Sequence, residues 1–171
     1  MKALKIIFGI IILIAAVFFM AGLVSPTLTY ETSVVINHPL EKTFEIYNTP
    51  ENLEKWMPGF ISMKTIEEKP GITGSQYEYV LDNQGQEMTI YETVTNYEEN
   101  KLIEFDFIAG DMLKKDLITF NSENSNTTIT NASTVTSNSY FYRCMFAFFK
   151  GMFKSIDQEN LEKFKAFADK Q

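Results

Sequence analysis

Cysteine and histidine are almost absent from this chain, which has one of each among 171 residues. The single cysteine, Cys144, excludes an intramolecular disulfide framework and any metal site built from several cysteines. The single histidine, His38, excludes paired-histidine metal motifs and leaves little basis for a Ser/His catalytic triad. Neither a metal nor another cofactor is therefore expected.

Basic residues are also scarce, with 15 Lys and Arg against 22 Asp and Glu and a formal net charge of −7. Nucleic-acid binding needs a basic face, so nucleic acid is not an expected partner. The sequence also lacks a glycine-rich phosphate loop, a nucleophile elbow and a clustered carboxylate pair, which argues against nucleotide chemistry and hydrolysis. The 45% hydrophobic content excludes disorder as the main state.

A long apolar run is present near the N-terminus. Residues 6–24 read IIFGIIILIAAVFFMAGLV, without a charged or strongly polar side chain. As a helix the run would span about 28 Å, close to the thickness of a bilayer core. A signal peptide is the alternative, but small residues are poorly spaced for cleavage and the run exceeds a usual signal core. We therefore expect residues 1–28 to form an uncleaved membrane anchor with a short tether at 25–28.

The charges around this run predict its orientation. Lys2 and Lys5 precede it, and the first charge after it is Glu31. By the positive-inside rule the N-terminus is cytoplasmic, and the rest of the chain lies on the periplasmic or extracellular side of a single-pass membrane protein. Residues 31–138 carry 7 Lys and Arg against 18 Asp and Glu. An acidic body is not drawn to anionic lipid, so any docking on the membrane would use the aromatic segment 140–149.

Residues 29–171 are predicted to form one α+β domain. Residues 30–37 have the alternation of a strand, and Pro39 and Pro50 begin two short helices. Six more strands are expected at 60–67, 76–81, 87–97, 102–109, 113–121 and 127–136. Their short turns favour an antiparallel meander. From residue 139 the apolar period becomes helical and predicts one helix of about 28 residues.

The apolar face of such a sheet must be covered, and the C-terminal helix is the one element large enough. We expect about seven curved antiparallel strands around this helix, with the two short helices closing one end. The space left between helix and sheet predicts a pocket. The inward stripe of the helix is expected to contain Met145, Phe149, Met152, Phe153, Ile156, Asn160, Phe164 and Phe167.

Candidate ligand contacts follow from these predicted faces. Phe105 and Phe107 share one strand face by the period of two, as do Tyr77 and Tyr79. Structural packing is the alternative interpretation for both tyrosines and for Trp56. The expected ligand-binding residues are Trp56, Tyr77, Tyr79, Ile90, Glu92, Phe105, Phe107, Phe149, Met152 and Phe153.

Glu92 is the one weak candidate for a catalytic residue. It is in phase with Ile90 and Val94, so an inward face would bring a carboxyl group into apolar surroundings. Burial would raise its pKa and suit it to acid–base work. Tyr91 and several threonines occupy the opposite phase, which leaves the facing ambiguous. A solvated or salt-bridged Glu92 is the preferred interpretation.

Three further positions have structural interpretations. His38 precedes Pro39 at a helix start and is expected to act as a cap. Cys144 is expected to be a buried apolar thiol. Asp116 lies next to lysines 114 and 115 and is expected at the surface.

Two segments carry a family resemblance. Residues 34–59 read VVINHPLEKTFEIYNTPENLEKWMPG, and residues 69–79 read KPGITGSQYEY. With the C-terminal NLEKFKAFAD, they resemble the START-like helix-grip (SRPBCC) superfamily, in its polyketide cyclase/dehydrase and lipid-transport branch. The resemblance covers nearly all of the chain after residue 30. It implies a helix-grip fold with a cavity for a hydrophobic ligand; the membrane anchor is an addition to that pattern.

Three functions are compatible with this pattern. A membrane-tethered binding protein for a hydrophobic small molecule or lipid is the leading hypothesis, with residues 6–24 in the membrane. A cyclase or dehydratase on the same scaffold is the second, and a non-binding interaction or stress module with a filled core is the third. Catalysis is the less favoured alternative, and the oligomeric state stays open.

Overall fold

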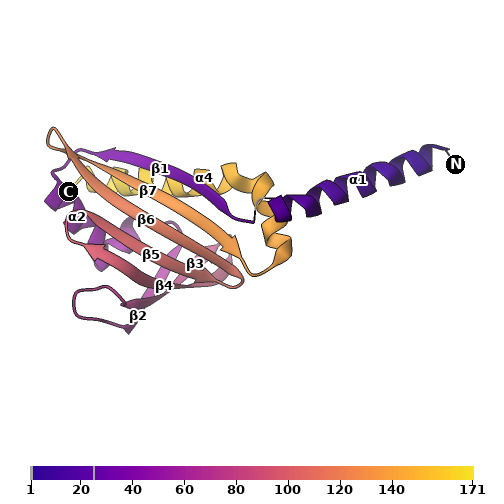
Figure 1. Cartoon of the computed structure of the whole chain (residues 1–171). Helices are drawn as coiled ribbons and strands as arrows, with labels where there is room; N and C mark the ends of the chain where they lie inside the picture. Colours follow the sequence, from indigo (N-terminus) through magenta and orange to yellow (C-terminus); the bar gives the residue numbers. More distant parts are fainter. Residues whose placement is uncertain (1, 25) are drawn as a thin grey trace.

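Seven antiparallel strands form one sheet in the computed structural model, which describes residues 2–24 and 26–171 (Figure 1). Their order is β1-β7-β6-β5-β4-β3-β2, so consecutive hairpins run from β2 to β7 and β1 pairs with β7. The strands are β1 (Leu28–Ile36), β2 (Phe60–Glu67), β3 (Gln76–Asn83), β4 (Gln86–Glu98), β5 (Leu102–Ala109), β6 (Met112–Glu123) and β7 (Asn126–Ser137). The predicted antiparallel meander is confirmed.

Tight turns join the consecutive strands from β3 to β7, whereas the longer segment 68–75 connects β2 to β3. Between β3 and β4 the backbone takes positive φ at Gln84 and Gly85, which matches the right-handed twist of the flanking strands. The Asp82 side chain accepts a hydrogen bond of 2.7 Å from the Gly85 amide and fixes this turn. Because successive side chains of a strand point to opposite faces, alternate residues of each strand lie on the inner face of the sheet.

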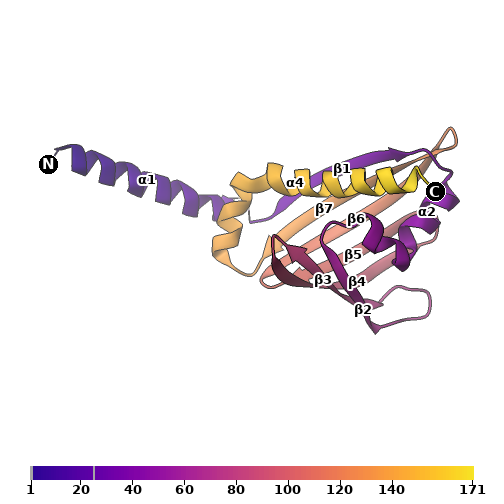
Figure 2. The same ribbon diagram turned by 180° about the vertical axis from the view of Figure 1, so that it is seen from behind.

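Helices cover the inner face of the sheet in two groups (Figure 2). The short helices α2 (Leu40–Asn48), η1 (Pro50–Asn52) and α3 (Leu53–Trp56) follow β1, and the 29-residue helix α4 (Tyr140–Ala168) follows β7. Seen from behind, α4 lies along β1 and β7, and its first part is bent away from the rest. The expected helix-grip architecture is confirmed.

The His38 ring has a different role from the one predicted. No side chain caps the N-terminus of α2, and the ring nitrogen Nε2 lies 2.9 Å from the Ala168 carbonyl oxygen at the end of α4. A helix C-terminus exposes carbonyl groups without intrahelical partners, and His38 donates to one of them. The predicted cap at the start of α2 is therefore wrong, because the end of β1 lies beside the C-terminal end of α4 and the ring bonds there.

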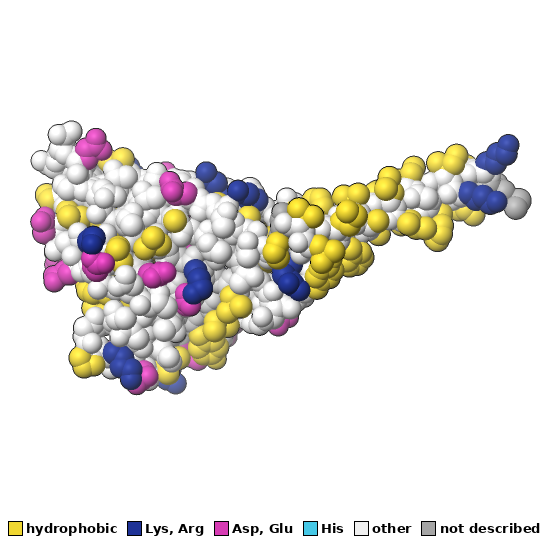
Figure 3. All heavy atoms as spheres, in the orientation of Figure 1, with side chains coloured by type: hydrophobic (Ala, Val, Ile, Leu, Met, Phe, Trp, Pro, Cys, Tyr) yellow, Lys and Arg dark blue, Asp and Glu magenta, His cyan; other side chains and the backbone are white. Residues whose placement is uncertain are grey.

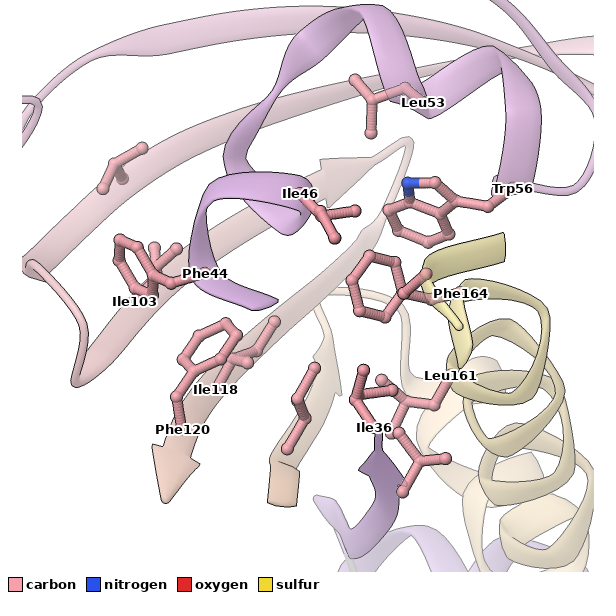
Figure 4. Packing of buried hydrophobic residues seen from close by; sticks show 14 of the residues in the cluster. Ile36, Phe44, Ile46, Leu53, Trp56, Ile103, Ile118, Phe120, Leu161 and Phe164 are labelled. Atoms are coloured by element: carbon pink, nitrogen blue, oxygen red, sulfur yellow. The ribbon is translucent and has the colours of Figure 1, made fainter. Parts of the chain in front are cut away.

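The main core lies between the short helices, the C-terminal half of α4 and the sheet (Figure 4). Phe164 of α4 packs edge-on against Tyr47 and Trp56, with ring centroids 5.1 and 5.2 Å apart. Phe44 packs edge-on against Phe120 of β6 at 4.9 Å. These aromatic contacts fasten the short helices to both α4 and the sheet.

The inward stripe predicted for α4 is only partly correct. Phe164 is fully buried, but Met152 and Ile156 are each 50% exposed. Asp157 and Leu161 are buried in their place. Asp157 faces the sheet, where it pairs with Lys114 of β6. The side of α4 that carries Met152 and Ile156 therefore faces outward.

One apolar helix, α1 (Lys2–Val24), precedes the sheet and extends away from it (Figure 1). It has 23 residues, and its most apolar stretch of 18 residues has a mean hydropathy of 3.0, so it is long and apolar enough to cross a membrane by length and composition. Its last turns pack on the start of α4, where a β-carbon on Gly22 would lie 2.5 Å from the Cys144 sulfur. The buried Cys144 thiol is confirmed. The expected tether at 25–28 includes residue 25, which lies outside the described residues.

Candidate functional site

A cavity of about 240 Å³ lies between the inner face of strands β2–β5 and the short helices. Tyr47, Leu53 and Trp56 line it on the helical side, and Met57 and Met63 follow in the chain. The sheet contributes Tyr77, Tyr79 and Leu81 from β3, Ile90, Glu92, Val94 and Tyr97 from β4, and Ile103, Phe105 and Phe107 from β5. Most of the wall is therefore apolar or aromatic, with Asn48 and Glu92 among its polar side chains, as is usual for small-molecule sites.

Seven of the ten predicted ligand-binding residues meet at this cavity. They are Trp56, Tyr77, Tyr79, Ile90, Glu92, Phe105 and Phe107. The strand register explains this, because Tyr79 pairs with Ile90, Tyr77 with Glu92, and Glu92 in turn with Phe107. Three adjacent strands thus present their inward side chains side by side.

The other three predicted residues, all in α4, do not line the cavity. Phe149 and Met152 are 38% and 50% exposed. Phe153 packs instead against a second core cluster that contains Leu28 and Phe146. The expected position of the cavity, between α4 and the sheet, is therefore wrong. Side chains of α4 such as Leu161 and Phe164 fill that space, and the cavity opens beside it, under the short helices.

Glu92 is the acidic group of the cavity wall. It is 7% exposed, so the preferred interpretation as a solvated or salt-bridged side chain is wrong. Burial raises the pKa of Glu92 to about 8; the hydrogen bond from Tyr79 opposes this shift and the charge of Asp116 adds to it. The carboxyl group is therefore mostly protonated and neutral at pH 7.

Tyr79 is the nearest polar partner of Glu92, with its hydroxyl 3.4 Å from Oε1. Burial first, and then the neighbouring Glu92, raise the pKa of Tyr79 above its ordinary value. Burial raises the pKa of Tyr47 in the same way. These phenols stay protonated, so the cavity offers neutral hydroxyl groups rather than fixed charges.

Trp56 forms part of both the core and the cavity wall. Its ring packs on Phe164 and lies 5.8 Å from Tyr47. Its indole Nε1 is buried without a hydrogen-bond partner among the described residues. The structural interpretation of Trp56 and the ligand-contact interpretation are therefore compatible.

A buried polar cluster, which the sequence analysis missed, lies beside the cavity between α4 and the sheet. Lys114 Nζ lies 2.7 Å from Oδ2 of Asp116 and 2.7 Å from Oδ2 of Asp157. Tyr30 donates to Asp157 at 2.8 Å, and the Ser133 hydroxyl lies 2.7 Å from Asp116. We call these five residues the lysine cluster. It holds α4 against β1, β6 and β7.

The expected surface position of Asp116 is therefore wrong. Asp116 is 4% exposed and shares the inward face of β6 with Ile118 and Phe120. Burial lowers the pKa of Lys114, but Asp116 and Asp157 outweigh this and hold it above its ordinary value. The period of two on β6 was the signal that could have revealed Asp116, because it is in phase with two apolar residues.

Within residues 2–24 and 26–171, no group of three or more His, Cys, Asp or Glu side chains is placed to hold a metal ion. Glu92 and the tyrosines of the cavity wall can supply hydrogen bonding and proton transfer.

Comparison with protein families identifies the scaffold. The family described as polyketide cyclase / dehydrase and lipid transport matches residues 27–168. The chain belongs to this family. Its members bind hydrophobic ligands in general, and residues 27–168 include every strand, the short helices and α4. None of the curated proteins compared with the chain matches it.

Solved structures share the fold at low sequence identity. The Zhui aromatase/cyclase from Streptomyces sp. R1128 superposes with a TM-score of 0.69 at 10% identity, over 84% of this chain and 94% of that one. A Staphylococcus aureus protein of unknown function gives 0.68 at 10% identity, over 85% and 96%. A Chromobacterium violaceum protein gives 0.64 at 17%, over 83% and 98%. At these identities the similarity shows the helix-grip fold alone.

Proposed function

We propose that this protein binds a compact hydrophobic molecule with one polar group in the cavity beneath the short helices, while α1 holds the domain at a membrane. The observation that carries the proposal is an apolar cavity with a single neutral carboxyl–phenol pair, Glu92 and Tyr79, in its wall. Apolar walls favour burial of a hydrophobic ligand, and a few polar groups fix its orientation.

The cavity chemistry narrows the ligand class. The Tyr79 hydroxyl donates to Glu92, which leaves the protonated Glu92 carboxyl as the donor of this pair, so a carbonyl or hydroxyl oxygen on the ligand is the matching group. The volume of about 240 Å³ is slightly below the roughly 300–1,000 Å³ of typical ligand sites. A compact ring compound, or a lipid whose chain leaves through the mouth, suits this space.

The proposed membrane attachment divides the chain into an anchor at 1–28 and a binding domain at 29–171. The 23-residue length of α1 supports it, since a helix of this length spans about 34 Å and only Lys2 and Lys5 in it are charged. Lys2 and Lys5 lie at the start of the helix, and its last turn has no basic residue. This asymmetry supports a cytoplasmic N-terminus and a domain on the outer side.

The ligand proposal predicts that purified protein carries an apolar molecule that organic extraction and mass spectrometry detect. Tyr79→Phe removes the hydroxyl that orients the Glu92 carboxyl and is expected to weaken binding of the re-added molecule by about 1 kcal/mol, or roughly fivefold. Tyr91→Phe is the matched control, because Tyr91 lies on the outer face of β4 and is 47% exposed. Equal affinities for the two variants would place the ligand outside this cavity.

The anchor proposal predicts that the full chain stays in the membrane pellet after alkaline extraction. Protease added to intact spheroplasts is expected to digest the domain and spare the N-terminal helix. Release of the domain into the soluble fraction would show that the apolar helix is a signal sequence. Protection of the domain until the membrane is lysed would reverse the proposed orientation.

A second candidate function, a cyclase or dehydratase, is favoured by the Tyr79–Glu92 contact. A carboxyl group with a pKa of about 8 can both donate and accept a proton near neutral pH. Incubation of the extracted molecule with the protein separates the two functions. An unchanged mass supports binding, whereas loss of water or a new ring supports catalysis. The open cavity argues against the third hypothesis, a non-binding module with a filled core.

A further inference from the structure

The first half of α4 has an apolar stripe that is about half exposed to solvent. Phe141, Phe148, Met152 and Ile156 are 56%, 55%, 50% and 50% exposed. They are spaced by seven, four and four residues and therefore lie on one face of the helix. We call these four residues the outer stripe. Tyr142 and Phe149 flank it and are also exposed.

The outer stripe begins where α1 meets the domain. Phe18 of α1 lies against Phe141 and Phe148, with ring centroids 5.6 and 5.9 Å apart. Figure 3 shows hydrophobic side chains that cover α1 and continue onto the adjoining end of the domain. A single apolar surface therefore extends from α1 onto α4.

The contact between α1 and α4 is close. The missing side chain of Gly22 leaves room for the Cys144 sulfur, and the Tyr140 hydroxyl donates to the Phe19 carbonyl oxygen. Because α4 touches the last turns of α1 directly, a bilayer that surrounds α1 also meets the start of α4.

We propose that the first half of α4 lies in the membrane interface, with the outer stripe among lipid headgroups and the upper acyl chains. This inference rests on the membrane attachment of α1 proposed above. Helices of this kind lie in the interface plane with their apolar face buried by about 5–10 Å. The domain is then held in one orientation on the membrane by two contacts, α1 and the outer stripe.

The charges favour a lipid surface as the partner. Residues 139–156 carry Arg143, Lys150 and Lys154 and no acidic residue. Basic side chains beside an apolar stripe reach lipid phosphates, while aromatic rings occupy the headgroup level. The strands and short helices are acidic, with 18 Asp and Glu against 7 Lys and Arg over residues 31–138. Anionic lipid therefore attracts the start of α4 and repels the rest of the domain.

Tryptophan fluorescence of the full chain in vesicles of phosphatidylcholine and phosphatidylglycerol tests this contact. Phe148→Trp places a probe on the outer stripe, and Met152→Trp is a second probe there. Tyr91→Trp, on the exposed outer face of β4, is the matched control, and Phe8→Trp reports on α1 itself. The native Trp56 is buried and provides the common background, measured in the unsubstituted chain.

Brominated lipids in the vesicles quench tryptophan that lies in the bilayer. We expect bromolipids to reduce the emission of Phe8→Trp, Phe148→Trp and Met152→Trp, and to leave the emission of Tyr91→Trp unchanged. Bromines attached near the headgroup should quench Phe148→Trp and Met152→Trp most effectively. Quenching of Phe8→Trp alone would overturn the interfacial contact and leave the anchor intact. Quenching of none of them would overturn both the anchor and the contact.

A second copy of the chain is the competing partner for the outer stripe. In that case Phe148→Trp would be shielded from aqueous acrylamide without quenching by bromolipid, and chemical crosslinking would yield dimers. That result would overturn the lipid contact. Circular dichroism of each variant identifies any that fail to fold, and either Phe148→Trp or Met152→Trp is sufficient for the test.

Discussion

Lys114→Met is expected to destabilise the protein by about 3–5 kcal/mol, because it leaves two buried carboxylates without their shared cation. Lys114 Nζ lies 2.7 Å from both Asp116 and Asp157, whose side chains are only 6% and 11% exposed. Urea unfolding of the full chain in detergent, followed by circular dichroism, measures the loss. Methionine keeps most of the side-chain volume, so the loss reports on charge rather than on a cavity.

Lys115→Met is the matched control on the same strand. Lys115 also pairs with an aspartate, Asp106, at 2.7 Å, but its side chain is 62% exposed. Exposed ion pairs contribute about 0–1 kcal/mol, so this change is expected to be nearly neutral. Adding Asp116→Asn and Asp157→Asn to Lys114→Met should recover part of the lost stability, because it removes the unpaired charges. Equal effects of the two lysine substitutions would show that the lysine cluster is solvated.

The fold could be predicted because its signals are local. Alternation along each strand and the short turns between strands specify an antiparallel meander, and these patterns depend only on neighbouring residues. The same alternation placed Phe105 and Phe107 on the inner face, where they line the cavity. Strand residues of the candidate site were therefore predictable from their phase.

The orientation of α4 could not be predicted in the same way, because this helix has two apolar stripes. One contains Met152 and Ile156, and the other contains Leu161 and Phe164. The choice between them depends on Asp157, whose partner Tyr30 is 127 residues away. A hydrophobic pattern does not identify a charged residue as buried, because its burial depends on partners that are distant in the sequence. The three α4 residues predicted to bind ligand were misplaced for this reason.

The facing of Glu92 was ambiguous for a related reason. Both faces of β4 contain residues that suit burial, since Tyr91 lies on one and Ile90 on the other. Only the pairing of Tyr79 with Ile90 and of Glu92 with Phe107 identifies the inner face. Pairing between strands is information that a single strand does not carry.

Glu92→Gln is expected to stabilise the protein increasingly as the pH rises, by up to about 5 kcal/mol at alkaline pH. The pKa of Glu92 is about 8 in the folded state, against an ordinary value of 4.5. Below both values the carboxyl is protonated in both states, and its ionisation does not affect stability. Between them the unfolded state loses its proton and the folded state keeps it, so the wild-type protein loses stability as the pH rises from 4.5 to about 8. Glutamine cannot ionise and removes this loss.

Unfolding midpoints of the wild-type protein and Glu92→Gln, measured from acidic to alkaline pH after extraction of bound ligand, test this expectation. The two midpoints should be similar near the acidic end and should separate steadily through neutral pH, with Glu92→Gln the more stable. Glu87→Gln is the matched control on β4, because Glu87 lies near the start of the same strand and is exposed. Its curve should run parallel to that of the wild-type protein. A parallel curve for Glu92→Gln as well would mean that Glu92 ionises freely in the folded protein, and the neutral carboxyl group proposed for ligand recognition would be ruled out.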